Sequence, residues 1–258
     1  VIAVFSTEKL SFEGEITNEL DLDLGFELPS REFTIRTSTD PDDGFYLMGE
    51  LNVPHLGYHY VEGVINSTEI SLTGIVNREI NIAGVTMPIS NGELTISNSR
   101  GVFLDGSFTL PFGLATARMS GNLTPEDASL SGNLTTGLTV AGHTFQYTNS
   151  SISASNAAGI KLSGRMNLYI FTTTVSGSIS PGGQFVLTGS YQYSADVGIG
   201  TFSSNVGVTI RNTGVSLGGT GTIKGPFGGT LYSGSYVINP NWSARTFRVC
   251  FGSSCFNI

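Results

Sequence analysis

The stretch GIKLSGRMNLYI, residues 159–170, decides the fold class of this chain. Its apolar residues and one glycine occupy every second position, and polar or charged residues fill most of the positions between them. Successive side chains of a β-strand point to opposite faces, so this alternation predicts an antiparallel strand with one buried face and one hydrated face. The same pattern recurs at 130–134 and 175–179. These stretches predict an all-β protein.

The composition of the whole chain agrees with this prediction. Of 258 residues, 34 are glycine, and 12% are charged. A helical protein uses far more alanine, leucine, glutamate, lysine and arginine. The 39% of hydrophobic residues is enough to form a core, which argues against disorder. No apolar run reaches the length of about 18 residues that a transmembrane helix requires.

The chain also contains an internal repeat. Short strings that end in glycine recur in four columns, and within each column the glycines lie 55 to 60 residues apart. The columns are Gly14, Gly74, Gly132 and Gly189; Gly25, Gly84, Gly142 and Gly200; Gly49, Gly106, Gly164 and Gly219; and Gly63, Gly121, Gly177 and Gly234. Four columns that keep the same order over four copies predict a repeat architecture.

The columns divide the chain into four units and part of a fifth. We expect an acidic first unit at 1–66, further units at 67–126, 127–183 and 184–241, and a partial unit with the cysteine pair at 242–258. Each full unit, of about 57–60 residues, would hold about five strands. Stacked or supercoiled antiparallel units are the favoured architecture. A closed barrel or sandwich and a four-bladed propeller are alternatives, whereas a membrane-spanning barrel would need aromatic girdles that the sequence lacks.

Glycine inside a strand weakens it, so these columns need a structural reason. In the second column the apolar residues change from even-numbered to odd-numbered positions at the glycine: Ile80 and Ile82 precede Gly84, whereas Met87 and Ile89 follow it. A slip of this kind predicts a β-bulge. We therefore expect the glycines to let the sheet bend sharply and to let a facing layer approach closely.

The net charge of −8 is concentrated at one end of the chain. Residues 1–50 contain 12 of the 20 acidic residues but only three of the 12 basic ones. The sequence has no basic stripe, so nucleic acid is a poor partner.

The two cysteines lie close together in the string CFGSSC. Glycine and serine between Cys250 and Cys255 suit a tight turn, so a disulfide across a small hairpin is the favoured interpretation. Free thiols and a metal site are the alternatives. A disulfide favours an oxidising compartment. We therefore expect an extracellular or cell-surface protein, with a periplasmic or outer-membrane-associated location as a further possibility.

Few residues suggest a metal site. Asp40, Asp42 and Asp43 are weak candidates for binding Ca²⁺, although aspartate is also an ordinary turn residue. His55 and His59 would lie about 13 Å apart on a strand, which is too far to share one ion. No other cofactor is predicted.

Acidic residues alternate with apolar ones on two neighbouring predicted strands, and these are Glu13, Glu15, Glu19, Asp21, Asp23 and Glu27. A glycosidase uses two carboxylates across a cleft, but no aromatic platform marks such a cleft here. The acidic strands are therefore expected to face solvent or a partner, and their charge discourages edge-to-edge aggregation. His143 stands alone, and no serine-hydrolase or phosphate-binding motif is present. No catalytic residue is predicted.

The favoured function is that of a non-catalytic structural or adhesive β-repeat protein. Repeats with unlike ends can associate head to tail into filaments of the same chain or bind another surface component, and an unfinished fifth unit would offer a strand edge. One alternative is a β-groove or cavity that binds a hydrophobic ligand such as lipid. The other is a glycan-acting enzyme or lectin.

Overall fold

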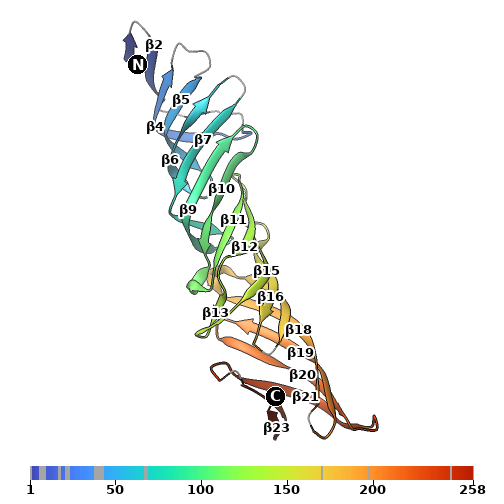
Figure 1. Ribbon diagram of the computed structural model, residues 1–258. Coiled ribbons are helices and arrows are strands. Elements are labelled where there is room, and N and C mark those ends of the chain that lie inside the picture. Colours follow the sequence, from blue (N-terminus) through green and yellow to red (C-terminus); the bar gives the residue numbers. More distant parts are fainter. Residues whose placement is uncertain are drawn as a thin grey trace.

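The computed structural model describes residues 2–5, 10–16, 19–20, 24–37, 44–66, 69–169, 171–196, 198–244 and 246–257. Nearly every element is an antiparallel strand, and the strands form a large curled sheet with the shape of a half-barrel. The molecule is elongated, and its two termini lie at opposite ends (Figure 1). Within the described residues, no helix has the length and apolar character needed to cross a membrane.

The strands follow the chain order from one end of the molecule to the other. The first predicted unit contains β1 (Ile2–Phe5), β2 (Leu10–Ile16), β3 (Glu19–Leu20), β4 (Leu28–Thr37), β5 (Phe45–Val53) and β6 (Gly57–Ile65). The second contains β7 (Ile70–Val76), β8 (Glu79–Ile82), β9 (Val85–Ser97), β10 (Gly101–Thr109), the 3-10 turn η1 (Pro111–Gly113) and β11 (Thr116–Leu123). The third contains β12 (Ala128–Leu134), β13 (Leu138–Val140), β14 (His143–Phe145), β15 (Tyr147–Ser155), β16 (Gly159–Asn167), β17 (Thr172–Ile179) and the 3-10 turn η2 (Pro181–Gly183). The fourth contains β18 (Phe185–Asp196), β19 (Thr201–Arg211), β20 (Gly214–Lys224) and β21 (Thr230–Asn241), and β22 (Thr246–Phe251) and β23 (Ser254–Asn257) complete the chain.

The sheet is a meander that joins all of these units. Long strands pair with the long strands before and after them in the sequence, and every pairing is antiparallel. The pairs β6–β7, β11–β12, β17–β18 and β21–β22 carry the sheet across the predicted unit boundaries without interruption. One continuous sheet of this kind fits the supercoiled arrangement and differs from a propeller, whose blades are separate sheets.

The predicted alternation is confirmed along β16. Ile160, Leu162 and Met166 are at most 3% exposed, whereas Lys161 and Arg165 point to solvent. The apolar faces of the other described strands contribute to the same core, which runs from Leu28 near one end to Phe251 near the other. Burial of this continuous apolar layer is the main force that holds the curled sheet together.

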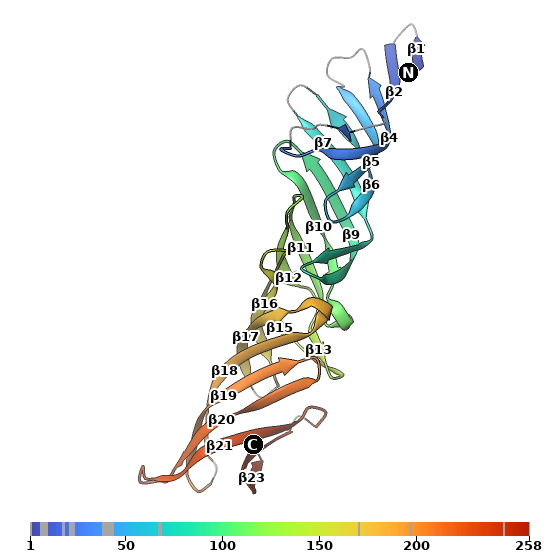
Figure 2. The same cartoon turned by 180° about the vertical axis from the view of Figure 1, so that it is seen from behind.

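Short bent hairpins add to the core of the second and third units. The hairpin β8–β9 buries Ile80, Ile82 and Met87 completely, and the hairpin β13–β14 buries Phe145. In the fourth unit, β18 and β19 instead form one uninterrupted hairpin, paired from Val186–Arg211 to Asp196–Thr201. The ends of these long strands extend away from the body of the molecule (Figures 1 and 2).

The glycines of three columns lie inside corresponding strands. Those at the junctions between units meet the backbone of the adjacent strand: a Cβ atom added at Gly121 would fall on the carbonyl oxygen of Ser129, and one added at Gly177 would fall on that of Val186. Gly132 has the same relation to the strand before it. Glycine therefore permits a close approach, as expected, but the neighbour is the paired strand of the same sheet and not a facing layer.

The prediction of a β-bulge at the second column is wrong. Ala83 and Gly84 are the two central residues of the β8–β9 hairpin, with φ angles of 52° and 77°, and Ala141 and Gly142 are their counterparts in β13–β14, with 47° and 80°. Two positive φ angles in succession are typical of a tight type I′ hairpin. The residues that pair across a two-residue turn point to the same face of the sheet, although they are three positions apart in the sequence. The turn therefore shifts the apolar residues from even to odd positions, just as a bulge would.

Candidate assembly surface

The meander places its turns alternately along the two long margins of the curled ribbon. The first margin carries the turns that follow β5, β8, β10, β13, β16, β18 and β20. The second margin carries the turns that follow β6, β9, β11, β15, β17, β19 and β21. Because the ribbon is coiled, first-margin turns lie against second-margin turns that come later in the sequence. We call this line of contacts the seam.

In the first unit, the seam is made by His55. Its Nε2 atom lies 2.8 Å from the carbonyl oxygen of Thr124, in the turn between β11 and β12. Its Nδ1 atom lies 3.4 Å from the side-chain nitrogen of Asn156, in the turn between β15 and β16. With these partners the ring donates a hydrogen bond from Nε2 and accepts one at Nδ1.

Asn156 ties further turns into the same network. Its side-chain oxygen accepts a hydrogen bond from the backbone N–H of Ala83 at 3.1 Å. Its own backbone N–H donates to the carboxylate of Asp127 at 2.6 Å. One side chain thus joins residues of the first, second and third units.

The seam between the second and third units is apolar. A Cβ atom added at Gly183 would lie 2.7 Å from Cβ of Pro111 and 2.8 Å from the ring of Phe112, so the turn η1 packs directly on this glycine. A Cβ atom added at Gly84 would lie 3.1 Å from Pro181. Figure 2 shows η1 beside the turn that precedes β18.

An aromatic cluster forms the seam between the third unit and the turn after β21. The ring of Trp242 lies 5.1 Å from that of Phe145, 6.3 Å from that of Tyr169 and 6.4 Å from that of His143. Phe247 packs against the same indole at 5.4 Å. The hairpin β21–β22 therefore reaches back to the third unit and closes its core.

One aromatic residue occupies the same place in four first-margin turns. These tip residues are His55, Phe112, Tyr169 and Phe227, and they follow one another at intervals of 57, 57 and 58 residues. The first three contact a second-margin turn, with 71% of Phe112 and 42% of Tyr169 left exposed. Phe227 is fully exposed, at 102%. The described chain therefore repeats one contact three times and leaves the fourth tip residue uncovered.

The surroundings of Phe227 are also apolar. Ile199 is 55% exposed and Leu231 57%. Ile199 lies in the turn before β19, and Leu231 lies at the start of β21, just after the turn that carries Phe227. These two turns lie side by side, because Thr201 at the end of one pairs with Lys224 at the start of the other. We call Ile199, Phe227 and Leu231 the tip patch. Exposed apolar side chains that gather at one place mark an interaction surface more often than single ones do.

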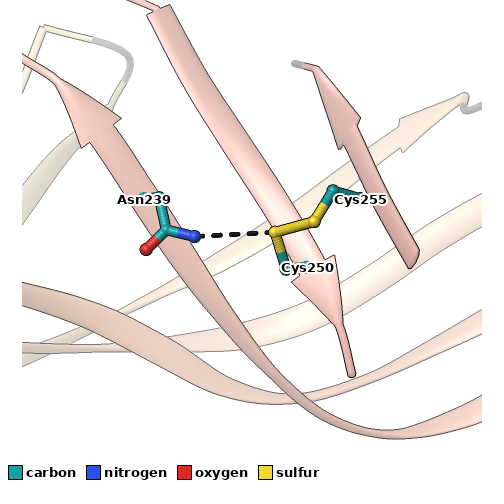
Figure 3. The surroundings of a disulfide bond; sticks show 3 residues. All are labelled: Asn239, Cys250 and Cys255. Atoms are coloured by element: carbon teal, nitrogen blue, oxygen red, sulfur yellow. Dashed lines mark hydrogen bonds between the residues drawn. A yellow bond between two sulfur atoms is a disulfide. The ribbon is translucent and has the colours of Figure 1, made fainter. Parts of the chain in front are cut away.

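The predicted disulfide is present between Cys250 and Cys255. The two residues face each other across the hairpin β22–β23, with their Cα atoms 4.1 Å apart. The side-chain nitrogen of Asn239, on the neighbouring strand β21, lies 3.5 Å from the sulfur of Cys250 (Figure 3). The disulfide thus fastens the last hairpin of the sheet.

Replacement of both cysteines by serine should loosen this hairpin and leave the rest of the sheet intact. Closing a loop this short stabilises the folded state by about 2 kcal/mol. We expect faster hydrogen exchange of the amides of 246–257 and unchanged exchange in β10 and β16. Mass spectrometry of the exchanged peptides checks this, and unaltered exchange at 246–257 would contradict it.

Most of the other predicted site residues lie outside the part of the chain that the structure describes. Asp40, Asp42 and Asp43, proposed for Ca²⁺, lie outside the described residues. The same is true of Asp21 and Asp23, and of the side chains of Glu13, Glu15 and Glu19, whereas Glu27 is exposed. In the described part of the chain, no three histidine, cysteine or acidic side chains lie close enough to hold a metal ion.

His59 has a structural place of its own. It lies on β6 opposite Leu51, is 6% exposed, and receives no partner for its Nε2 atom among the described residues. Its Nδ1 atom lies 3.2 Å from the carbonyl oxygen of Gly57. Burial lowers the pKa of His59 below the usual 6.5, and the positive charge of Arg78 acts in the same direction.

This burial predicts a dependence of stability on pH. Because the pKa of His59 is lower in the folded state, the unfolded chain binds the proton more readily. The contribution of His59 is complete above about pH 6.5 and is lost as the pH falls through the folded-state pKa. Urea denaturation between pH 8 and 5 should show a shallower decline below pH 6.5 for His59→Leu than for the wild type. Equal slopes above pH 7 serve as the control, and equal slopes below pH 6.5 would contradict the prediction.

A shallow depression lies on the hydrated face, where the first and second units meet. Tyr60, Glu62, Ile75 and Glu93 are among the residues that line it. Tyr46 donates a hydrogen bond to the carboxylate of Glu62 at 3.1 Å. The depression is broad and open, so it does not exclude water from these carboxylates.

Comparison of the chain with protein-family models, curated proteins and solved structures found no match. The candidate surface therefore rests on the geometry of this chain alone. Sequence reasoning missed the tip residues because it searched for columns of identical residues. A search for aromatic rings at the repeat period would have found them.

Proposed function

We propose that this protein is a non-catalytic structural component of an extracellular or cell-surface assembly and that its copies associate head to tail. The observation that carries this proposal is the seam. The same contact between a tip residue and a second-margin turn occurs three times within the chain, and the fourth tip residue, Phe227, is fully exposed. A contact that recurs along a coil, together with an exposed fourth tip residue, supplies the unlike surfaces of a heterologous interface, which builds filaments when the rotation does not close.

Two further features support a structural role outside the cell. The disulfide Cys250–Cys255 fits an oxidising compartment. The sheet is continuous from unit to unit, so the units form one elongated body.

Lipid binding has less support as a second candidate. A lipid groove would need open space along the apolar face, and there the side chains of Leu104, Leu130 and Ile160 are at most 2% exposed. A groove along this face would require these packed side chains to move apart.

Sedimentation velocity over a wide range of protein concentrations tests the proposed function. We expect the weight-average sedimentation coefficient to rise with concentration, and negative-stain electron microscopy of the concentrated sample to show rods longer than one molecule. A single monomeric species at the highest concentration would overturn the proposal.

A further inference from the structure

We propose that the tip patch, centred on Phe227, is the surface that binds a second copy of this chain, through Asn66 and Glu69 of that copy, which lie between β6 and β7. This inference rests on the proposed function and adds to it the two surfaces that meet.

The seam itself supports this interface. A tip residue lies between the third and fourth glycines of each unit, and the first three tip residues each contact the second unit-joining turn that follows them in the sequence. His55 meets Thr124, Phe112 meets Gly183, and Tyr169 meets Trp242. By the same rule Phe227 requires a turn that joins two units, and no such turn lies on it in the described chain.

The turn between β6 and β7 resembles the turn between β11 and β12. In the turn between β11 and β12, the backbone N–H of Thr124 donates to the carbonyl oxygen of Asp127, whose own N–H donates to the Thr124 hydroxyl. In the turn between β6 and β7, the backbone N–H of Asn66 donates to the carbonyl oxygen of Glu69, whose own N–H donates to the Asn66 side chain. The two turns thus share one hydrogen-bonded form, and the first of them receives the tip residue His55.

The residue types of the tip also fit this partner. The turn at 225–229 contains Pro226-Phe227-Gly228, the same three residue types as η1, Pro111–Gly113. Within the chain, η1 packs on the unit-joining turn at 180–184. A turn of the same composition at the C-terminal end of the molecule is therefore suited to the same kind of partner.

The two ends of the chain differ in charge. Residues 1–66 contain thirteen acidic and three basic residues, whereas residues 184–258 contain one acidic and four basic residues. The two surfaces that we bring together thus belong to parts of the chain with opposite net charge. Complementary charge steers association and favours a head-to-tail orientation over a head-to-head one.

The test compares two variants that each remove one exposed apolar side chain. Phe227→Ser changes the tip patch, and Ile75→Ser is the matched control, because Ile75 is 77% exposed on β7, away from both margins. Circular dichroism first confirms that both variants fold. Sedimentation equilibrium then measures self-association of the intact chain. We expect Phe227→Ser to weaken association by about tenfold or more and Ile75→Ser to change it by less than about twofold.

The possible outcomes separate this inference from the proposed function. If the wild type associates and Phe227→Ser associates equally well, the tip patch is not the interface, and only this inference is overturned. If the wild type remains monomeric, the proposed function fails and the inference fails with it. A third outcome is that the monomeric wild type binds vesicles of anionic phospholipid and that Phe227→Ser does not. This result would also overturn the inference, because the tip patch would then bind a membrane.

Discussion

Replacing Gly121 by alanine should lower the free energy of unfolding by about 3 kcal/mol, at the upper end of the usual cost of overpacking. The added Cβ atom would fall on the carbonyl oxygen of Ser129 in the paired strand β12, with the Cα of Leu130 only 3.0 Å away. Backbone atoms cannot turn aside as a flexible side chain can, so β11 and β12 must separate. Gly177→Ala should have a similar effect at the β17–β18 junction, where the Cβ atom would fall on the carbonyl oxygen of Val186.

Urea denaturation followed by circular dichroism measures this loss. Gly229→Ala is the matched control, because a Cβ atom added at Gly229 has no neighbour within 4 Å. We expect the control to change the free energy of unfolding by less than about 0.5 kcal/mol. If Gly121→Ala proves as stable as the control, the close approach of strands at the unit junctions is not a feature of the protein.

Replacing Trp242 by alanine should cost about 3 kcal/mol. The indole packs edge-on against Phe145 at 5.1 Å and against Phe247 at 5.4 Å, so its removal leaves a cavity between the third unit and the hairpin β21–β22. We expect faster hydrogen exchange in β13–β14 as well as in β21–β22, because the seam joins the two hairpins.

Trp242→Phe is the conservative comparison for this variant. A smaller ring that still reaches Phe145 should restore part of the stability and most of the protection of β13–β14. If Trp242→Ala alters exchange in β21–β22 alone, the aromatic cluster does not couple the two hairpins.

Local features of the fold were predictable from the sequence, and contacts between distant turns were not. The alternation in residues 159–170 predicts β16 because strand periodicity is written into neighbouring residues. The repeat predicts that similar elements recur. The contact between His55 and Thr124 joins residues 69 positions apart. It forms only because the sheet coils strongly enough to bring the two turns together, and the degree of coiling cannot be read from a local sequence pattern.

The shift of the apolar residues from even to odd positions at Gly84 shows a second limit of prediction from the sequence. A β-bulge and a two-residue hairpin both shift the apolar pattern by one position, so the sequence alone does not separate them. The preceding alanine pointed away from a hairpin, because a positive φ angle is unfavourable for alanine. In the structure Ala83 adopts that angle, and its backbone N–H is held by the side chain of Asn156.

The candidate surface was predictable only in outline. An acidic first unit and unlike ends indicated head-to-tail association, but the tip patch could not be located, because Ile199 and Phe227 lie in different turns. Their proximity follows from the pairing of Thr201 with Lys224, which becomes visible only when the register of β19 and β20 is known.

An intermolecular cross-link tests the central claim most directly. Two variants are prepared separately, one with Phe227→Cys and one with Glu69→Cys, each with the native disulfide retained. They are then mixed under mild oxidation. The account predicts a cross-linked dimer that joins one variant to the other, and much less product when Ile75→Cys replaces Glu69→Cys. Equal cross-linking in both mixtures would contradict the claim that copies contact each other as the turns of the seam do. The absence of cross-linking in a mixture that still self-associates would contradict it as well.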